Sequence, residues 1–374
     1  MFGITDFKAF LIPICIGVYL VWLLWTRPAD PVRDSATVQY EPPENLTPGE
    51  CGALLENVVD VRFITATIVD LSVKGYLTID HNSAGRTPGE QSDDRDYYFH
   101  LTKPLSEWKN LKQHEWQVAS AIFIPTNPLE MLSESMADVQ KAGGSNPALA
   151  AMLAQVQSTI TASPALRELS ERANTPQPSA GLSELRSHFP LHLARIRKAI
   201  FDALQSGGYY TRRPDQVRLL YTAAAVMTGL LIAFMGMYLG KAGREVLPWI
   251  LSALITAMMI WWAGLVMPAR SVAGMRALGK VLGFKDFLSR VEKGRLEKLD
   301  DSRQLFEKYL PYAMALGVDS RWAESFANIA VPPPQWYRGK NNNFFPVQFV
   351  SGLNSASGQM GSVKAPAPND GLGR

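Results

Sequence analysis

The sequence predicts an α-helical membrane protein with three transmembrane helices and an α+β cytoplasmic module that contains winged-helix-like units. Two apolar runs, 219–239 and 247–267, follow one another along the chain and contain no charged residue. At ~1.5 Å per helical residue, runs of about 20 residues cross a hydrocarbon core of ~30 Å. The polar hinge between them, 240–246, has room only to reverse the chain. The two runs therefore predict a transmembrane hairpin.

A third apolar run, 9–25, follows a short N-terminal segment, 1–8, and predicts the first transmembrane helix. Because this run is shorter than the other two, a cleaved signal peptide is the alternative. The run ends in Trp22 and Trp25, however, and not in the small residues that a signal peptidase requires. Its Pro13 falls in the first turn, where a helix tolerates proline. We therefore expect an uncleaved anchor.

Basic residues predict the orientation of the three runs. Lysine and arginine are densest at 27–33, 212–218 and 270–285, and such flanks stay in the cytoplasm. The N-terminus and the hinge then face outwards, as in a multi-pass protein of the cell (inner) membrane whose C-terminus is inside. The basic side chains expected beside the membrane are Arg212, Arg213, Arg218, Arg270, Arg276 and Lys280. The aromatic side chains expected at the membrane interfaces are Trp22, Trp25, Tyr238, Trp249, Trp261 and Trp262.

Composition narrows the expected partners. A formal net charge of +3 over 374 residues shows no overall basic excess of the kind that nucleic acid requires. Anionic lipid attracts each basic residue near a membrane by ~1 kcal/mol, so membrane lipid is an expected partner. The only two cysteines are Cys15, inside the first apolar run, and Cys51, in the soluble part. They provide neither a disulfide nor a thiolate metal site, which fits a reducing, cytoplasmic location for most of the chain.

The soluble part begins with a stalk, 26–45, and a winged-helix-like α+β unit, 46–124. In this unit Asp60 is expected to cap a helix whose apolar residues recur at helical spacing until Gly75. Two strands, separated by a polar turn, and a further helix are expected after it, at 76–79, 97–101 and 111–123. Later segments are expected to form a flexible insertion at 125–185, a helix-Gly-strand unit at 186–216, C-terminal cytoplasmic helices at 268–331 and a disordered tail at 332–374.

A winged helix raises the hypothesis of DNA binding, which requires a recognition helix rich in lysine and arginine. The expected helix carries Asp70 beside Arg62 and Lys74, and the expected wing is acidic, with Asp93, Asp94 and Asp96. These charges would repel a phosphate backbone. We therefore interpret the unit as a module used for protein contact or packing and do not expect nucleic acid as a partner.

No motif indicates a catalytic residue, a metal site or a cofactor. His188 and His192 have the spacing of helical metal ligands, but Pro190 lies between them and no third ligand is near. Patterns of the G-x-S-x-G nucleophile or of glycine-rich phosphate loops do not occur. In the second apolar run, Gly236 and Gly240 have the small-xxx-small spacing of a helix contact.

Several blocks resemble the cytoplasmic part of the YciQ-like predicted membrane proteins, at 40–50, 62–79, 283–292, 306–318 and 322–323. The most specific piece is Leu-Pro-Tyr-Ala-x-Ala-Leu-Gly at 310–317, and the resemblance covers roughly 38–330, with the insertion matching least. It implies a bacterial-type membrane protein from a family of unknown function, and no reaction. Members usually carry a cleaved signal and an extracytoplasmic β-rich domain before the first span. This chain starts at the span, which weakens a sensor interpretation that relies on an outer domain and leaves a separately encoded partner as the alternative.

Three functional interpretations follow. The first is a scaffold or interaction component of a bacterial cell-membrane assembly, with a protein partner in the membrane or the cytoplasm. The second is a membrane-tethered winged-helix regulator that binds nucleic acid. The third is an enzyme whose site assembles from residues far apart in the sequence, with an unknown small-molecule ligand.

Overall fold

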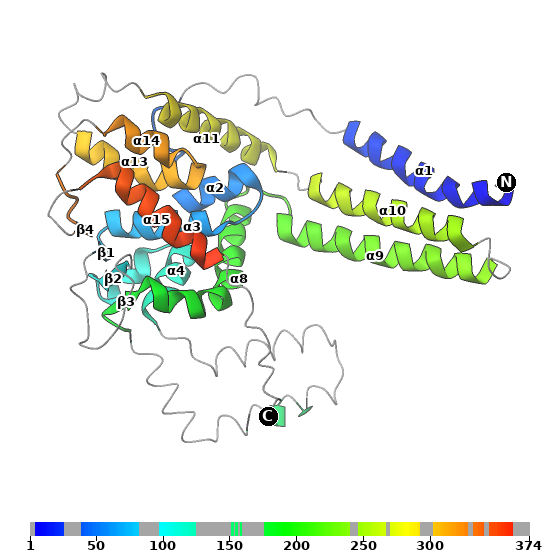
Figure 1. Ribbon diagram of the computed structural model, residues 1–374, viewed down its shortest axis with the longest axis horizontal. Helices are drawn as coiled ribbons and strands as arrows, with labels where there is room; N and C mark the ends of the chain where they lie inside the picture. Colours follow the sequence, from blue (N-terminus) through cyan, green and yellow to red (C-terminus); the bar gives the residue numbers. More distant parts are fainter. Residues whose placement is uncertain are drawn as a thin grey trace, which may run out of the picture. The chain divides into compact units, whose positions relative to one another are not determined.

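The computed structural model describes residues 4–25, 39–81, 97–124, 151–152, 154–155, 158, 176–239, 246–266, 270–291, 302–327, 332–339 and 344–361. Most of the expected stalk, the polar turn of the wing, most of the expected insertion and the hinge lie outside these residues. The chain divides into two compact units (Figure 1). Unit 1 comprises Met1–Leu46, Glu50–Val59 and Phe201–Phe287, and unit 2 comprises Thr47–Gly49, Asp60–Ile200 and Leu288–Arg374.

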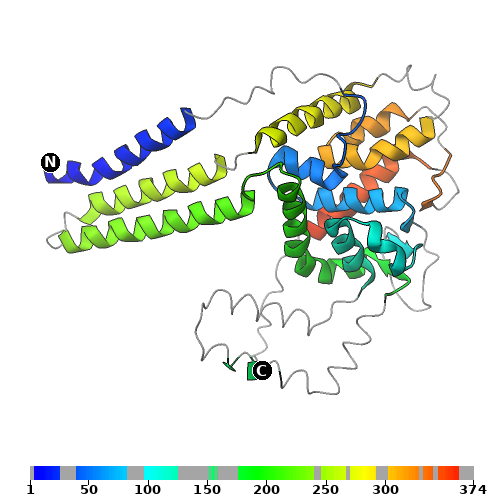
Figure 2. The ribbon, with the colours of Figure 1, turned by 180° about the vertical axis from the view of Figure 1, so that it is seen from behind.

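Unit 1 contains the three apolar helices. They are α1 (Ile4–Trp25), α9 (Pro214–Leu239) and α10 (Val246–Val266), and they lie side by side in both views (Figure 1 and Figure 2). By length and composition, α9 and α10 are able to cross a membrane over Pro214–Tyr238 and Leu247–Leu265. The apolar stretch of α1, Phe10–Trp22, is shorter. The expected hairpin is therefore present as a pair of long apolar helices.

Glycines allow these helices to pack closely. A Cβ at Gly229 would meet the Ala257 methyl group at 3.4 Å, and a Cβ at Gly264 would meet Tyr221 Cβ at 2.5 Å. Gly236 lies directly against Trp249, so the helix contact expected at this glycine is present. Gly240 lies outside the described residues. Small residues at the interface let two helix backbones approach, while many large side chains of the hairpin, such as Leu230 and Leu254, are exposed.

Helix α1 packs on the same bundle. Leu20 of α1 and Ala263 of α10 form a small buried cluster that Ile16, Met259 and Tyr221 complete. A Cβ at Gly17 would meet the end of the Met259 side chain at 2.7 Å. The first apolar run is therefore a packed member of unit 1 and not an isolated segment.

Unit 2 contains a four-stranded sheet in the order β3-β2-β1-β4. Its strands are β1 (Leu77–Asp80), β2 (Tyr98–Leu101), β3 (Ser179–Gly181) and β4 (Tyr337–Arg338). The first three strands pair antiparallel, with Ile79 opposite Phe99, and β4 adds to β1 in parallel, with Tyr337 opposite Ile79. Ile79 and Phe99 are buried, so one face of this small sheet contributes to the core.

The central element of unit 2 is α3 (Val61–Val73). It begins at the expected cap, where the Asp60 side chain accepts the Arg62 N–H, and it ends before Gly75, whose φ is +76°. All ten residues from Phe63 to Ser72 are buried. Three helices pack around it, namely α4 (Gln113–Phe123), α13 (Ser302–Leu316) and α15 (Pro346–Gly361).

The winged-helix expectation is not confirmed, and this burial argues against a DNA-reading role for α3. The order helix, helix, strand, strand is present, with α2 (Pro48–Glu56) before α3. A recognition helix must keep one face free for a DNA groove, whereas α3 is covered by other helices. The expected helix-Gly-strand unit also differs, because after α8 (Leu182–Ser206) and Gly208 the chain forms only one isolated bridge, at Tyr210. Further helices are η2 (Leu105–Asn110), α11 (Val272–Arg290) and α14 (Asp319–Ser325).

The region after Pro332, expected to be disordered, instead contributes β4 and α15 to unit 2. Its aromatic side chains explain the difference, because Tyr337 packs at 5.1 Å between ring centroids against both Phe344 and Phe349. Trp336 Nε1 donates to Glu307 of α13 at 2.9 Å. The prediction relied on the proline, asparagine and glycine content and overlooked these aromatic residues. The end of the expected insertion is likewise structured, because β3 and the start of α8 lie within 125–185.

Truncation of the aromatic cluster provides the first test. Phe349 is 3% exposed, so we expect Phe349→Ala to lower the free energy of unfolding by about 3 kcal/mol through lost burial and a new cavity. Thermal unfolding of the full chain in mild detergent, followed by tryptophan fluorescence, measures this change. Val347→Ala on the same helix is the control, since Val347 is 39% exposed. Equal melting temperatures for the two variants would contradict an ordered α15.

Candidate functional site

The two ends of the hairpin meet in unit 1. Tyr210, before α9, forms an isolated antiparallel bridge with Arg270, after α10. The Ser271 N–H donates to the Tyr209 carbonyl at 3.0 Å, and the Ser271 hydroxyl donates to the Gly208 carbonyl at 2.5 Å. Gly274 lies so close to the Tyr209 carbonyl that any side chain would collide with it. We call residues 208–213 and 270–274 together the collar.

The collar holds the carboxyl end of α2. The Arg270 guanidinium donates through Nε to the Leu54 carbonyl at 2.9 Å and through a terminal nitrogen to the Leu55 carbonyl at 3.1 Å. These carbonyls lie in the last turn of α2, which lacks helical N–H partners and carries the negative end of the helix dipole. A cation at this place caps the helix and also neutralises the negative end of its dipole.

Tyr210 makes a second connection to the same helix end. Its hydroxyl donates to the Asn57 side-chain oxygen at 2.5 Å, and Asn57 itself adopts φ +57° directly after α2. Burial raises the pKa of the Tyr210 phenol above its usual value, against the opposing effect of Arg270 and Arg218. The phenol therefore keeps its proton at neutral pH and remains a hydrogen-bond donor. Arg270 and Tyr210 thus attach both ends of the hairpin to one short helix.

Arg213 stabilises the start of α9. It is buried, and its guanidinium binds Asp215 through two nitrogens, at 2.5 and 3.1 Å, and Asp202 through the third, at 2.8 Å. Burial alone would lower the pKa of Arg213, but the bonds and charges of the two aspartates outweigh it and raise the pKa. A planar guanidinium suits such a bidentate arrangement, and a lysine would not reproduce it.

The structure therefore separates the basic residues expected beside the membrane into two groups. Arg213 and Arg270 are occupied by protein contacts within unit 1. Arg218 is half-buried, and its Nε has no hydrogen-bond partner within the described part of the chain. The exposed members of the set are Arg212, Arg276 and Lys280.

The aromatic residues expected at the interfaces are nearly all on the outside of their helices. Trp249 is half-buried because it packs on Gly236. The others are exposed, namely Trp22, Trp25, Tyr238, Trp261 and Trp262.

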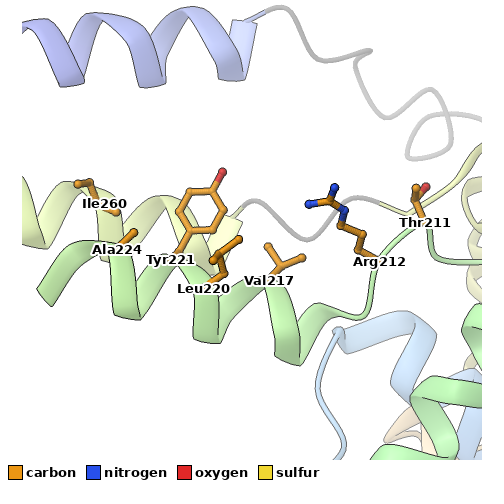
Figure 3. A pocket seen from close by; sticks show the side chains of 7 residues that line it. All are labelled: Thr211, Arg212, Val217, Leu220, Tyr221, Ala224 and Ile260. Carbon is orange, nitrogen blue, oxygen red and sulfur yellow. The ribbon is translucent and has the colours of Figure 1, made fainter. Parts of the chain in front are cut away.

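A cavity of about 410 Å³ lies beside the collar in unit 1. One end is polar, with the Arg212 guanidinium and the Thr211 hydroxyl, and the rest of the wall is apolar except for the Tyr221 hydroxyl. Figure 3 shows the Arg212 and Tyr221 side chains extending towards the same side of α9. The lining residues are Thr211, Arg212, Val217, Leu220, Tyr221, Ala224 and Ile260.

Unit 2 contains a separate cluster of charges at the end of α3. Lys74 Nζ lies 2.7 Å from an Asp70 oxygen and 2.6 Å from a Glu115 oxygen, and Glu115 also accepts the Lys112 N–H at 2.9 Å. Burial raises the pKa of Asp70 to about 6, with Lys74 opposing and Glu115 adding to the effect. For Glu115, burial is outweighed by Lys74 and the Lys112 N–H, so its pKa is lowered. In the sequence, the i, i+4 spacing of Asp70 and Lys74 is the one signal of this cluster, because Glu115 lies 41 residues after Lys74.

The described residues contain no group of three His, Cys, Asp or Glu side chains arranged to hold a metal ion. His192 is buried in α8, and the side chain of His188 lies outside what the structure describes. The arrangement offers two chemical properties instead. One is a cationic end on an apolar cavity beside the hairpin, and the other is a carboxyl group in unit 2 that changes charge near pH 6.

The Asp70 carboxyl predicts a pH dependence of stability. Its folded-state pKa is about 6 against a usual 3.8, so its contribution is complete below about pH 4 and is lost as the pH rises to about 6. The melting temperature of the natural chain should therefore fall relative to that of Asp70→Asn over this range and run parallel to it at higher pH. At ~1.4 kcal/mol per pKa unit, the whole effect is at most ~3 kcal/mol.

Thermal unfolding of both proteins in detergent across this pH range measures the difference. The exposed carboxylate of Glu107 supplies the control, since Glu107→Gln should follow the natural chain at every pH. Parallel curves for the natural chain and Asp70→Asn from pH 4 to 7 would contradict the assignment.

Comparison with known proteins gives one match. The model of a family described as predicted membrane protein (DUF2207), C-terminal domain, matches residues 37–326, which is more than half of the chain. This confirms the resemblance to YciQ-like predicted membrane proteins. No curated protein and no solved structure matches. With the paired apolar helices of the hairpin, the match establishes that the chain belongs to this family of predicted membrane proteins, whose function is unknown.

Proposed function

We propose that this protein is a scaffold in a cell-membrane assembly, with three transmembrane helices and a soluble module in the cytoplasm. The observation that carries the proposal is the collar. Arg270 and Tyr210 bind the carboxyl end of α2 and so join the hairpin to the soluble chain through fixed hydrogen bonds. A flexible tether would leave α2 unattached, whereas these hydrogen bonds give this part of the soluble chain a defined attachment to the hairpin within unit 1.

Exposed apolar side chains support the membrane part of the proposal. On α9 and α10 the glycines face the partner helix, while large residues such as Leu230, Phe234, Leu254 and Met258 are exposed. Such a surface is larger than a water-soluble monomer usually presents, and hydrocarbon is the solvent that suits it. Helix α1 has 22 residues, so at ~1.5 Å each it is ~33 Å long, and its exposed Val18 and Val21 give it the same character.

Trp116 on α4 supports the interaction part. Its side chain is 40% exposed although α4 is packed against α3. Tryptophan is enriched among residues that contribute most to protein–protein binding. We therefore place one protein contact of the scaffold at this side chain. The nucleic-acid hypothesis has no comparable support, because the helix that would read DNA is buried on all sides.

The proposed topology predicts a labelling pattern. In a Cys15→Ser background, a membrane-impermeant maleimide should label Lys241→Cys, in the hinge, on intact cells. Arg276→Cys, at an exposed position of α11, should react only after the membrane is disrupted. Cys51 is fully buried and serves as an internal control that stays unlabelled. The inverse pattern would reverse the orientation, and equal labelling of both sites on intact cells would refute the membrane hairpin.

Capture of partners tests the scaffold itself. Affinity purification of the full chain in mild detergent, followed by mass spectrometry, should retain a stoichiometric membrane or cell-envelope protein. Trp116→Ala should reduce its recovery several-fold, while Lys109→Ala, at an exposed position nearby in sequence, should not. A chain recovered alone would contradict the scaffold, and salt-sensitive recovery of DNA would favour the regulator instead.

A further inference from the structure

We propose that the cavity beside the collar binds one anionic phospholipid, with its phosphate at Arg212 and an acyl chain along α9. The proposal rests on the membrane insertion proposed above. It adds a specific lipid site to a general attraction between basic residues and the membrane, and three features of the cavity support it.

The first feature is an available cation. Arg212 is exposed and, unlike Arg213 next to it, has no ion pair or hydrogen bond within the described residues. Asp215, the nearest acidic residue along the chain, is already bound by Arg213 through two hydrogen bonds. The hydroxyl groups of Thr211 and Tyr221 line the same cavity and add donors for phosphate oxygens. The positive charge of Arg212 is therefore not balanced by a carboxylate of the described residues, and the polar end of the cavity attracts an anion.

The second feature is the apolar wall. Val217, Leu220 and Ala224 recur at positions i, i+3 and i+7 of α9 and share one helix face, and Ile260 of α10 completes the wall. From Val217 to Ala224 the helix rises ~10 Å, which is enough to contact the first part of an extended acyl chain. A free anion such as inorganic phosphate would leave this wall unused. The cavity volume of about 410 Å³ falls within the usual range for a ligand site.

The third feature is depth in the membrane. The uncharged run 219–239 fills a hydrocarbon core of ~30 Å, so Leu220 and Ala224 lie in its first turns. Arg212 precedes this run and therefore lies at the level of the lipid headgroups. A phospholipid has its phosphate and its first methylene groups at these same two levels. The polar end of the cavity thus lies at the level of the headgroups, and its apolar wall lies at the level of the acyl chains.

Native mass spectrometry of the full chain in mild detergent tests the site. The probes are phosphatidylglycerol and phosphatidylcholine with the same acyl chains, added separately and in equal amounts. We expect a one-lipid adduct that is stronger with phosphatidylglycerol. Arg212→Gln should reduce this adduct about fivefold, which corresponds to ~1 kcal/mol for one cation at a membrane surface. Arg276→Gln removes an exposed arginine outside the cavity and should leave the adduct unchanged.

A second variant tests the apolar wall. Ala224→Phe places a ring in the cavity and should reduce the adducts of both lipids, whereas Arg212→Gln should reduce mainly that of phosphatidylglycerol. Equal adducts for the two lipids, or equal losses in Arg212→Gln and Arg276→Gln, would overturn the proposal. Displacement of the lipid by millimolar inorganic phosphate would also overturn it, because the site would then recognise a free anion.

A flotation assay separates this inference from the proposed function. Each variant is mixed into phosphatidylcholine vesicles, washed with alkaline carbonate and floated. A natural chain that is lost from the vesicles would refute membrane insertion and the lipid site with it. A chain that floats but shows no lipid preference in mass spectrometry would refute the lipid site alone.

Discussion

The structure of unit 1 depends on one interaction, the binding of the Arg270 guanidinium to the carbonyls of Leu54 and Leu55. The partners lie more than 200 residues apart in the sequence and join the chain after the hairpin to the end of α2. The carbonyls would otherwise lack partners, and an unpaired buried polar group costs ~1–3 kcal/mol. Tyr210 repeats the connection from the other side of the hairpin through Asn57. Together these contacts make the junction a defined structure.

The centre of unit 2 is organised differently, by burial of a whole helix. From Phe63 to Ser72 every residue of α3 is covered, including polar ones. Thr67 and Ser72 donate their hydroxyls to carbonyls one turn earlier, so their burial leaves no unpaired group. Asp70 differs from these hydroxyl residues because its carboxylate carries a charge. Burial raises the pKa of this carboxyl group, although Lys74 opposes the shift. The charged cluster therefore lies where a packed helix ends.

The two neighbouring arginines at the start of α9 show how context assigns function. Arg213 is buried between Asp202 and Asp215, and it stabilises the fold. Arg212 lines a cavity with an apolar wall and has no such partner in the described structure. The two arginines are adjacent in sequence and lie at the same end of α9. One forms ion pairs within the protein, and the other is available to a ligand. A lipid would use the charge that the protein leaves open.

Local patterns in the sequence were sufficient to predict the apolar helices, the Asp60 cap and Gly75 end of α3, and the positions of β1 and β2. These features depend on residues close together in the chain, since hydrophobic periodicity, caps and positive φ angles act locally. Only the tertiary structure decided that α3 is buried on all faces, that a proline- and asparagine-rich tail supplies α15, and which arginines are occupied. Those outcomes depend on contacts between residues tens to hundreds of positions apart, and nothing in the spacing of Arg212, Arg213 and Arg270 distinguishes a capping or ion-paired guanidinium from an open one.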